Sequence, residues 1–137
     1  MKKIKLPLII EWSDHNLIYG RVNYDDNLMV DSATSIDVLK KKFEKLLKSF
    51  HHIKPNDLEF DIQYDIAGLF DQKKYLNASA IADQAGISRG LMRQYMAGNK
   101  YPSAERALVI QNTIRNLGKE LQKIKMAIPK TKRTLSY

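Results

Sequence analysis

The chain of 137 residues contains no cysteine. This absence excludes disulfide bonds, thiolate catalysis and cysteine-based zinc sites, and it is typical of a reducing compartment. Long apolar runs are also missing. Leu6–Ile10 is too short for the apolar region of a signal peptide, and no segment approaches the roughly 18 apolar residues of a membrane span. We therefore expect a cytoplasmic protein with no membrane partner.

Motifs of common catalytic sites are missing as well. The sequence has no phosphate-binding loop, no G-x-G-x-x-G fingerprint and no G-x-S-x-G nucleophile elbow. His15, His51 and His52 are not spaced with other metal ligands, and Asp25 and Asp26 stand in a predicted turn. A metal-dependent nuclease needs several convergent carboxylates. We expect no enzymatic activity, no cofactor and no metal site.

Charge, by contrast, is abundant and unevenly placed. The chain has 23 Lys and Arg against 15 Asp and Glu, a formal net charge of +8. Residues 1–70 hold 10 basic and 11 acidic side chains, whereas residues 71–137 hold 13 and 4. This asymmetry indicates two modules with different partners, the alternative being one domain with a single basic face. The basic half favours a polyanionic partner.

The first half of the chain begins with strand patterns. Apolar residues alternate over Ile4–Trp12, and Pro7 predicts that this strand lies at a sheet edge or that Pro7 is near its start. Leu17–Tyr24 is rich in β-branched and aromatic residues, and residues 25–27 form a turn before the short apolar run 28–30. We predict a three-stranded meander.

A helix and a fourth strand follow. Thr34 with Asp37 has the form of a capping box and predicts a helix start at Thr34. Apolar residues then recur at three and four: Ile36, Leu39, Phe43, Leu46, Leu47, Phe50 and Ile53. The intervening lysines of residues 40–48 form a solvated face or, alternatively, secondary phosphate contacts. Pro55 breaks the helix, and residues 59–65 alternate as a strand with one apolar and one acidic face.

The second half shows only helix signals. Three caps predict three helices: Asn77 to about Ala85, Ser88 to Ala97, and Ser103 to about Met126. We predict the fold class α+β, with a small β-β-β-α-β domain followed by an all-α domain. The predicted boundaries are 1–68 for the first domain, 69–126 for the second, with the Leu69-Phe70 pair at the junction, and 127–137 for a flexible basic tail.

Residues 78–97 match the position pattern of a helix-turn-helix. Two helices that cross steeply need a small residue at their contact and a residue free to take positive φ in the turn, which are Ala82 and Gly86. The apolar positions of the pattern are Ile81, Ala85, Ile87, Met92 and Tyr95. A purely structural helical hairpin is the alternative, but the basic charge independently predicts a polyanion at the same place.

In such a unit the second helix enters the major groove and its outward side chains reach base edges. The predicted DNA-binding residues of this helix are Ser88, Arg89, Gly90, Arg93 and Gln94. Arginine suits guanine and glutamine suits adenine, both by bidentate hydrogen bonds. Further cations are expected to contact phosphates, which raises affinity without reading sequence: Lys100, Arg106, Lys73 and Lys74.

The connector after the second helix makes the resemblance specific. Residues 98–103, GNKYPS, resemble the G-x-x-x-P-S connector of the Cro and phage-repressor (XRE) class of helix-turn-helix domains. The resemblance covers residues 77 to about 121. Gly98 is expected to end the second helix, Pro102 to keep the loop from becoming helical, and Ser103 to cap the next helix.

With the first half included, the whole chain resembles a HicB-type antitoxin of bacterial toxin-antitoxin systems. That resemblance implies a degenerate RNase H-like domain that binds and blocks a HicA-like mRNA-cleaving toxin, and a domain that represses the operon by binding operator DNA. A ribonuclease that holds RNA is basic, so carboxylates would attract it electrostatically. The predicted toxin-binding residues are Glu59, Asp61, Asp65, Asp25, Asp26 and Asp31. An ordinary solvated strand face is the alternative.

The last helix carries a heptad seam that predicts self-association. Its members are Ile110, Ile114, Leu117, Leu121, Ile124 and Ile128. Part of this seam must cover the helix-turn-helix core, but Leu117, Leu121 and Ile124 are predicted to join two copies. A homodimer, or a higher oligomer, would present two recognition helices to a palindromic operator.

Two functional hypotheses remain at this point. The first is a HicB-like antitoxin that neutralises its toxin and represses its own operon. The alternative is a stand-alone phage-type repressor whose N-terminal domain oligomerises or senses a ligand. A nuclease is a more remote possibility.

Overall fold

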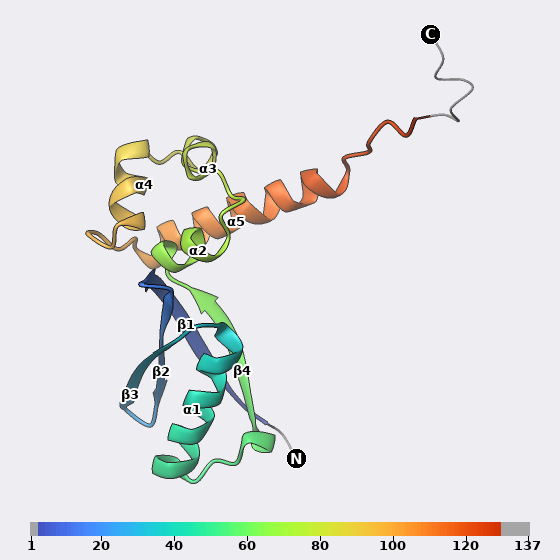
Figure 1. Ribbon diagram of the computed structural model, residues 1–137. Helices are drawn as coiled ribbons and strands as arrows, with labels where there is room; N and C mark the ends of the chain where they lie inside the picture. The colour runs from blue at the N-terminus through green and yellow to red at the C-terminus, as the bar shows by residue number, and fades with distance from the viewer. Residues whose placement is uncertain (1–2, 130–137) are drawn as a thin grey trace.

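The computed structural model describes residues 3–129, which form a sheet region and a helical region (Figure 1). The predicted α+β class is confirmed. The strands are β1 (Ile4–Asp14), β2 (Leu17–Tyr24), β3 (Asn27–Ala33) and β4 (Leu58–Tyr64). The helices are α1 (Ile36–His51), a 3₁₀ turn η1 (Pro55–Asp57), α2 (Ile66–Gln72), α3 (Ala78–Ala85), α4 (Arg89–Met96) and α5 (Ala104–Gln122). No described helix is both long and apolar enough to cross a membrane.

The four strands form one mixed sheet in the order β3-β2-β1-β4. The first three strands are antiparallel neighbours, and β4 lies parallel to β1. Two-residue turns join the hairpins, and His15, Asn16, Asp25 and Asp26 all have positive φ. Positive φ at both central residues matches the twist of the flanking strands, and Asn and Asp tolerate this region better than most residues. The predicted turn at Asp25-Asp26 and the meander are confirmed.

Of the two placements predicted for Pro7, the sheet edge is wrong, whereas Pro7 does lie near the start of its strand, three residues after Ile4. β1 lies between β2 and β4. Its pairing with β2 begins only at Ile9, however, while Ile4 to Ile10 pair with β4. Pro7 therefore lies in a stretch of β1 that has one paired neighbour, which is why a residue without an N–H donor is tolerated inside this strand.

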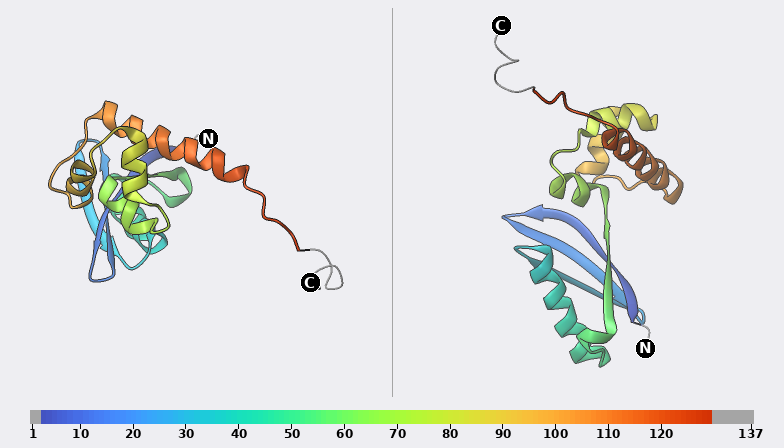
Figure 2. Two further views of the ribbon diagram at one scale, coloured as in Figure 1. Left: turned by 90° about the horizontal axis from the view of Figure 1, so that it is seen from above. Right: turned by 90° about the vertical axis from the view of Figure 1, so that its right-hand side faces the viewer.

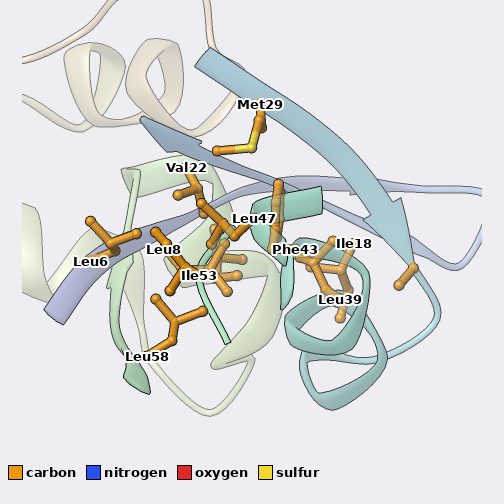
Figure 3. Packing of buried hydrophobic residues seen from close by; sticks show 12 residues of the cluster. Leu6, Leu8, Ile18, Val22, Met29, Leu39, Phe43, Leu47, Ile53 and Leu58 are labelled. Carbon is orange, nitrogen blue, oxygen red and sulfur yellow. The ribbon is translucent and has the colours of Figure 1, made fainter. Parts of the chain in front are cut away.

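α1 covers one face of the sheet and closes the larger of two hydrophobic cores (Figure 3). Leu8 and Ile10 of β1 and Leu39, Phe43 and Leu47 of α1 are completely buried. Their spacing on α1 is the predicted one, but Phe50 is 66% exposed and takes no part in this core. The lysines of α1 point largely to solvent, as their solvated-face interpretation predicts.

The start of α1 corrects the predicted cap. The N-cap is Ser35, whose hydroxyl accepts a hydrogen bond from the Val38 amide at 3.1 Å. Thr34, the predicted cap, lies one position earlier and is exposed. Adjacent Thr and Ser offer the same capping chemistry, so the register is set by the path of the chain from β3 and not by residue type.

α2 was not predicted, and it connects the two regions (Figure 1). A Cβ atom on Gly68 would lie 2.0 Å from the carbonyl oxygen of Glu11, so α2 lies almost directly against the backbone of β1. Asp71 accepts a hydrogen bond from the Ser13 amide at 2.7 Å, and Phe70 is buried in the second core. The predicted boundary between residues 68 and 69 falls inside this helix.

α3, α4 and α5 enclose the second core together with α2. Its buried members are Phe70, Ile81, Ala82, Ile87, Met92, Tyr95 and Ile110. All three predicted caps of these helices are confirmed, but α5 ends at Gln122 and not near Met126. Past the core, α5 projects away from the rest of the molecule (Figure 2). Because few tertiary contacts stabilise its C-terminal end, the helix stops before the predicted residue.

Candidate nucleic-acid interface

α3 and α4 form a tight helix pair whose turn depends on Gly86. The Asn77 side chain accepts from the Ala80 amide and caps α3, while Gly86 ends it with φ of 73°. Ser88 then accepts from the Leu91 amide and starts α4. A left-handed residue between the two caps turns the chain within three residues, as the sequence predicts.

The buried side of this pair matches the predicted apolar positions. Ile81, Ala82 and Met92 are at most 1% exposed, and Ile87 and Tyr95 are also buried. Ala85 is half-buried at the edge of this core. Because one side of α4 is committed to the core, its opposite side is fixed in orientation toward solvent.

The outward side of α4 carries the predicted DNA-binding residues. Ser88, Arg89, Gly90, Arg93 and Gln94 are all exposed. Arginine and glutamine are the side chains that best recognise guanine and adenine in the major groove. Arg89, Gly90, Arg93 and Gln94 therefore lie on the exposed side of α4, and Ser88 lies directly before them as its N-cap.

Gly90 has no structural reason within the described chain to be glycine. A Cβ atom there would meet nothing closer than the Arg93 guanidinium at 3.8 Å, and Gly90 is not among the residues with positive φ. Glycine in a helix costs about 1 kcal/mol relative to alanine. The bare backbone at this position instead leaves room for a close external surface.

The four predicted phosphate-binding cations differ in their exposure. Lys100 and Arg106 are exposed near the end of α4 and in the first turn of α5, and Lys74 is exposed before α3. Lys73 is half-buried, with its ammonium 6.0 Å from the ring centroid of Tyr64. The contact with Tyr64 makes Lys73 less available to a phosphate, whereas the other three side chains are exposed and can approach phosphates.

Arg89 makes an ion pair that the sequence patterns did not reveal. Its Nε and Nη2 donate to the two carboxylate oxygens of Asp83 at 3.1 and 2.6 Å. This hydrogen bonding raises the pKa of Arg89 and holds the pKa of Asp83 below its ordinary value. The pair bridges the turn between α3 and α4. An Asp six residues before an Arg is not a helix-spacing signal, so only the turn geometry brings the two together.

The six predicted toxin-binding carboxylates do not form one patch. Asp31 pairs in register with buried Gly20, so it faces α1, where Lys42 lies 3.8 Å away. Glu59 and Asp61 follow the opposite face of β4, and Asp25 and Asp26 lie in the β2–β3 turn. Because β3 and β4 are the two edges of the sheet, these groups are separated by its full width.

Asp65 belongs instead to an ion cluster around Arg21. Arg21 Nη1 lies 2.5 Å from Glu11 and 2.8 Å from Asp65. The hydrogen bond to Asp65 raises the pKa of Arg21 above its usual range. The cluster ties β2 to β1 and to the residue that begins α2, so Asp65 is better described as part of the junction than as a free acidic surface.

A cavity of about 500 Å³ lies beside this cluster, between the sheet and the loop after α4. The register of β1 is irregular between Ile10 and Ser13, and Trp12, within this stretch, stacks on the ring of Tyr19 with ring centroids 4.9 Å apart. Trp12, Tyr64 and Tyr101 line the cavity together with Lys100 and the Arg21 cluster. Its volume is within the range of small-ligand sites.

The predicted dimerisation residues have three different environments. Leu117 packs against the second core, Leu121 is 63% exposed on the projecting end of α5, and Ile124 is 61% exposed beyond the end of that helix. Leu117 is thus partly a core residue, as the alternative interpretation holds. Within the predicted tail, Lys130, Lys132 and Arg133 lie outside the described residues.

Residues 3–129 contain no group of three side chains placed to hold a metal ion. Comparison of the chain with protein-family models, with curated proteins and with solved structures finds no match. The functional interpretation therefore depends on the geometry of the chain itself.

Proposed function

We propose that α3 and α4 form a helix-turn-helix and that the protein binds DNA in a sequence-specific manner. The observation that carries this proposal is α4 itself, whose inner side is locked into a core while Arg89, Arg93 and Gln94 project from its outer side. A rigid helix of this kind fits the major groove, where such side chains read base edges.

The charge of the surroundings supports the same proposal. Residues 71–137 hold 13 basic and 4 acidic side chains. Of these, Lys100 is exposed just after α4, and Arg106 is exposed beside the turn between α3 and α4. Cations around a recognition helix bind phosphates and set the register of the protein on the duplex. Two copies joined through the exposed end of α5, at Leu121, would present two α4 helices to a palindromic operator.

For the sheet region we propose the role of a HicB-type antitoxin domain that binds a HicA-like ribonuclease toxin. The observed element order β-β-β-α-β supports it. The sheet face opposite α1 is the surface we assign to the toxin, because Leu28 and Val30 are each 58% exposed there and Glu59 and Asp61 line its β4 edge. A basic partner that spans this face would meet the apolar side chains at its β3 edge and the carboxylates at its β4 edge.

One observation favours a second candidate function. The cavity between the sheet and the α4–α5 loop is large enough for a small ligand and touches both regions. A ligand bound there would change the position of α4 relative to the sheet. A repressor that senses a ligand works in this way. This candidate shares the DNA-binding step and replaces only the toxin.

The two roles separate in one experiment on the full-length chain. The chain is co-expressed with a small basic protein encoded beside its gene, and both growth rescue and repression of the upstream promoter are measured. Arg93→Ala should abolish repression and keep rescue, while the double variant Leu28→Glu, Val30→Glu should abolish rescue and keep repression. If the wild type gives no rescue and no neighbouring protein co-purifies with it, while repression persists, the ligand-sensing repressor replaces the antitoxin.

Binding of the purified chain to its upstream DNA should also weaken steeply with salt, since each phosphate contact releases counterions. A flat dependence of the dissociation constant between low and moderate salt would contradict the DNA-binding proposal itself.

A further inference from the structure

Asp83 contacts Arg89 of the proposed recognition surface, which is an unfavourable place for a carboxylate in a DNA-binding protein. A carboxylate beside a DNA-binding face repels phosphates and lowers affinity for DNA of any sequence. Residues 71–137 contain only four acidic side chains, and one of them is bonded to a candidate base-reading arginine.

The geometry of the pair decides which part of Arg89 remains free. A guanidinium has five N–H donors in one plane. Asp83 takes Nε and one hydrogen of Nη2, through bonds of 3.1 and 2.6 Å. Both hydrogens of Nη1 and the second hydrogen of Nη2 remain. One Nη1 hydrogen and the free Nη2 hydrogen lie side by side at the end of the guanidinium, where they can donate two parallel hydrogen bonds to O6 and N7 of guanine.

The position of Arg89 along α4 fits this use. Arg89 is the first residue of α4, directly after the Ser88 cap. The N-terminal part of a recognition helix lies deepest in the major groove. A long side chain at this position loses rotamer freedom on binding, and a partner that already holds it in one geometry removes part of that cost.

We infer that Asp83 is a positioning residue that holds Arg89 in the orientation for a bidentate contact to one guanine of the operator half-site. Asp83 does not touch DNA. It increases base discrimination, while its negative charge lowers affinity for DNA of any sequence. The Asp83–Arg89 ion pair, here called the clamp, has this role only if α4 binds DNA as proposed above. Arg93, one turn further along α4, reads its base without such a clamp.

The test uses the full-length chain and a chemical change in the guanine itself. An operator is first selected with wild-type protein from a library of random duplexes. Each guanine of the selected duplex is then replaced, one at a time, by 7-deazaguanine, which keeps the Watson–Crick pair and removes the N7 acceptor. At one guanine per half-site the wild type should lose roughly tenfold in affinity.

The variants assign that guanine and the role of Asp83. Arg89→Ala should bind the natural and the 7-deaza duplex equally. Asp83→Asn should reduce the penalty to less than about threefold, because the bidentate geometry is no longer held. The same variant should bind random duplex DNA more tightly than the wild type, since a negative charge is removed.

Two controls separate positioning from charge and from folding. Glu105→Gln removes one exposed negative charge from the first turn of α5, so it should tighten binding to random DNA and leave the 7-deaza penalty unchanged. Gln84→Ala alters the residue next to Asp83, also exposed, and should change neither quantity. Equal melting temperatures of the variants show that the fold is intact.

Each outcome has one meaning. A 7-deaza penalty in Asp83→Asn equal to that of the wild type overturns the inference, because the ion pair then only braces the turn. Tighter binding of Asp83→Asn to the operator with an undiminished penalty also overturns it, since Asp83 then withholds Arg89 from DNA. If the wild type selects no common sequence, the proposed function fails before the clamp is tested.

Discussion

The sheet region and the helical region differ in how far acidic side chains balance the basic ones. Residues 1–70 hold 10 basic and 11 acidic side chains, and two of the basic ones, Arg21 and Lys42, are paired with carboxylates. In the described part of the helical region there is one ion pair, Arg89 with Asp83, although ten Lys and Arg lie between residues 71 and 129. Acidic side chains offset the cations of the sheet region, whereas the excess of cations in the helical region attracts a polyanion.

α2 lies between these two regions and belongs to both. It lies against the backbone of β1 at Gly68 and places Phe70 in the second core. If the regions are physically coupled, a change in α2 disturbs both of them. The contrast in charge would then occur within one cooperative unit.

The largest expected effect follows from replacing Gly68 by Ala. The added Cβ would lie 2.0 and 2.3 Å from two carbonyl oxygens of β1, which are backbone atoms that cannot rotate away. We expect a loss on the order of 3 to 5 kcal/mol in the free energy of unfolding, at the severe end for single substitutions. Urea titration followed by Trp12 fluorescence and by helix circular dichroism measures it.

Both signals should shift together in Gly68→Ala. Trp12 reports the end of β1, and circular dichroism reports mainly the helices. If fluorescence shifts and the helix signal does not, the two regions unfold independently and α2 is only a linker. Gly118→Ala is the matched control, since a Cβ atom in that helix meets nothing within 4 Å.

The sequence predicted what local chemistry determines. Turn residues such as Asp25-Asp26 and Gly86 and the caps Asn77, Ser88 and Ser103 act through their own backbone and next neighbours, so their pattern is visible in the chain. The buried and exposed sides of α4 followed from periodicity for the same reason. These signals were enough to predict the two regions and the candidate DNA-binding face.

Features that depend on contacts across the fold were missed. α2 is seven residues long with a glycine inside it, a poor helix by propensity, and it is stabilised by packing on β1. The Arg21 cluster joins residues 10 and 44 positions apart. The scatter of the predicted acidic surface has the same origin, because strand order and register decide which carboxylates become neighbours.

Within the helical region, Arg93→Ala tests whether the unpaired cations include a base reader. We expect a loss of about 1 to 3 kcal/mol in binding to the selected operator and a small loss on random duplex DNA. Competition binding at fixed salt measures both. Lys100→Ala is the comparison, because a phosphate contact should weaken binding to the two DNAs equally. Equal losses for Arg93→Ala would show that Arg93 reads no base.

A smaller effect distinguishes stability from function on the same helix. Gly90→Ala should stabilise the fold by roughly 0.5 to 1 kcal/mol, because alanine loses less backbone freedom in a helix. It should nevertheless weaken operator binding, since the added methyl group stands on the surface that approaches DNA. Thermal melting measures the gain in stability, and operator binding measures the loss of affinity. Gly118→Ala should give the gain in stability alone, and unchanged operator binding in Gly90→Ala would place the DNA elsewhere.

The smallest expected effect concerns the one ion pair of the helical region. Arg89 holds the pKa of Asp83 below its ordinary value, so the pair stabilises the fold above the unfolded-state pKa of Asp83. This contribution is lost as the pH falls through the lowered value. Because both side chains are about half exposed, the change in stability is small, and the titration itself is the better measurement. Carbon-13 NMR of the Asp83 carboxyl group should show the lowered pKa, which returns to its ordinary value in Arg89→Ala and stays low in the control Arg115→Ala. The same titration curve in wild type and Arg89→Ala would mean that the pair does not persist in solution, and Arg89 would then be as free as the cations around it.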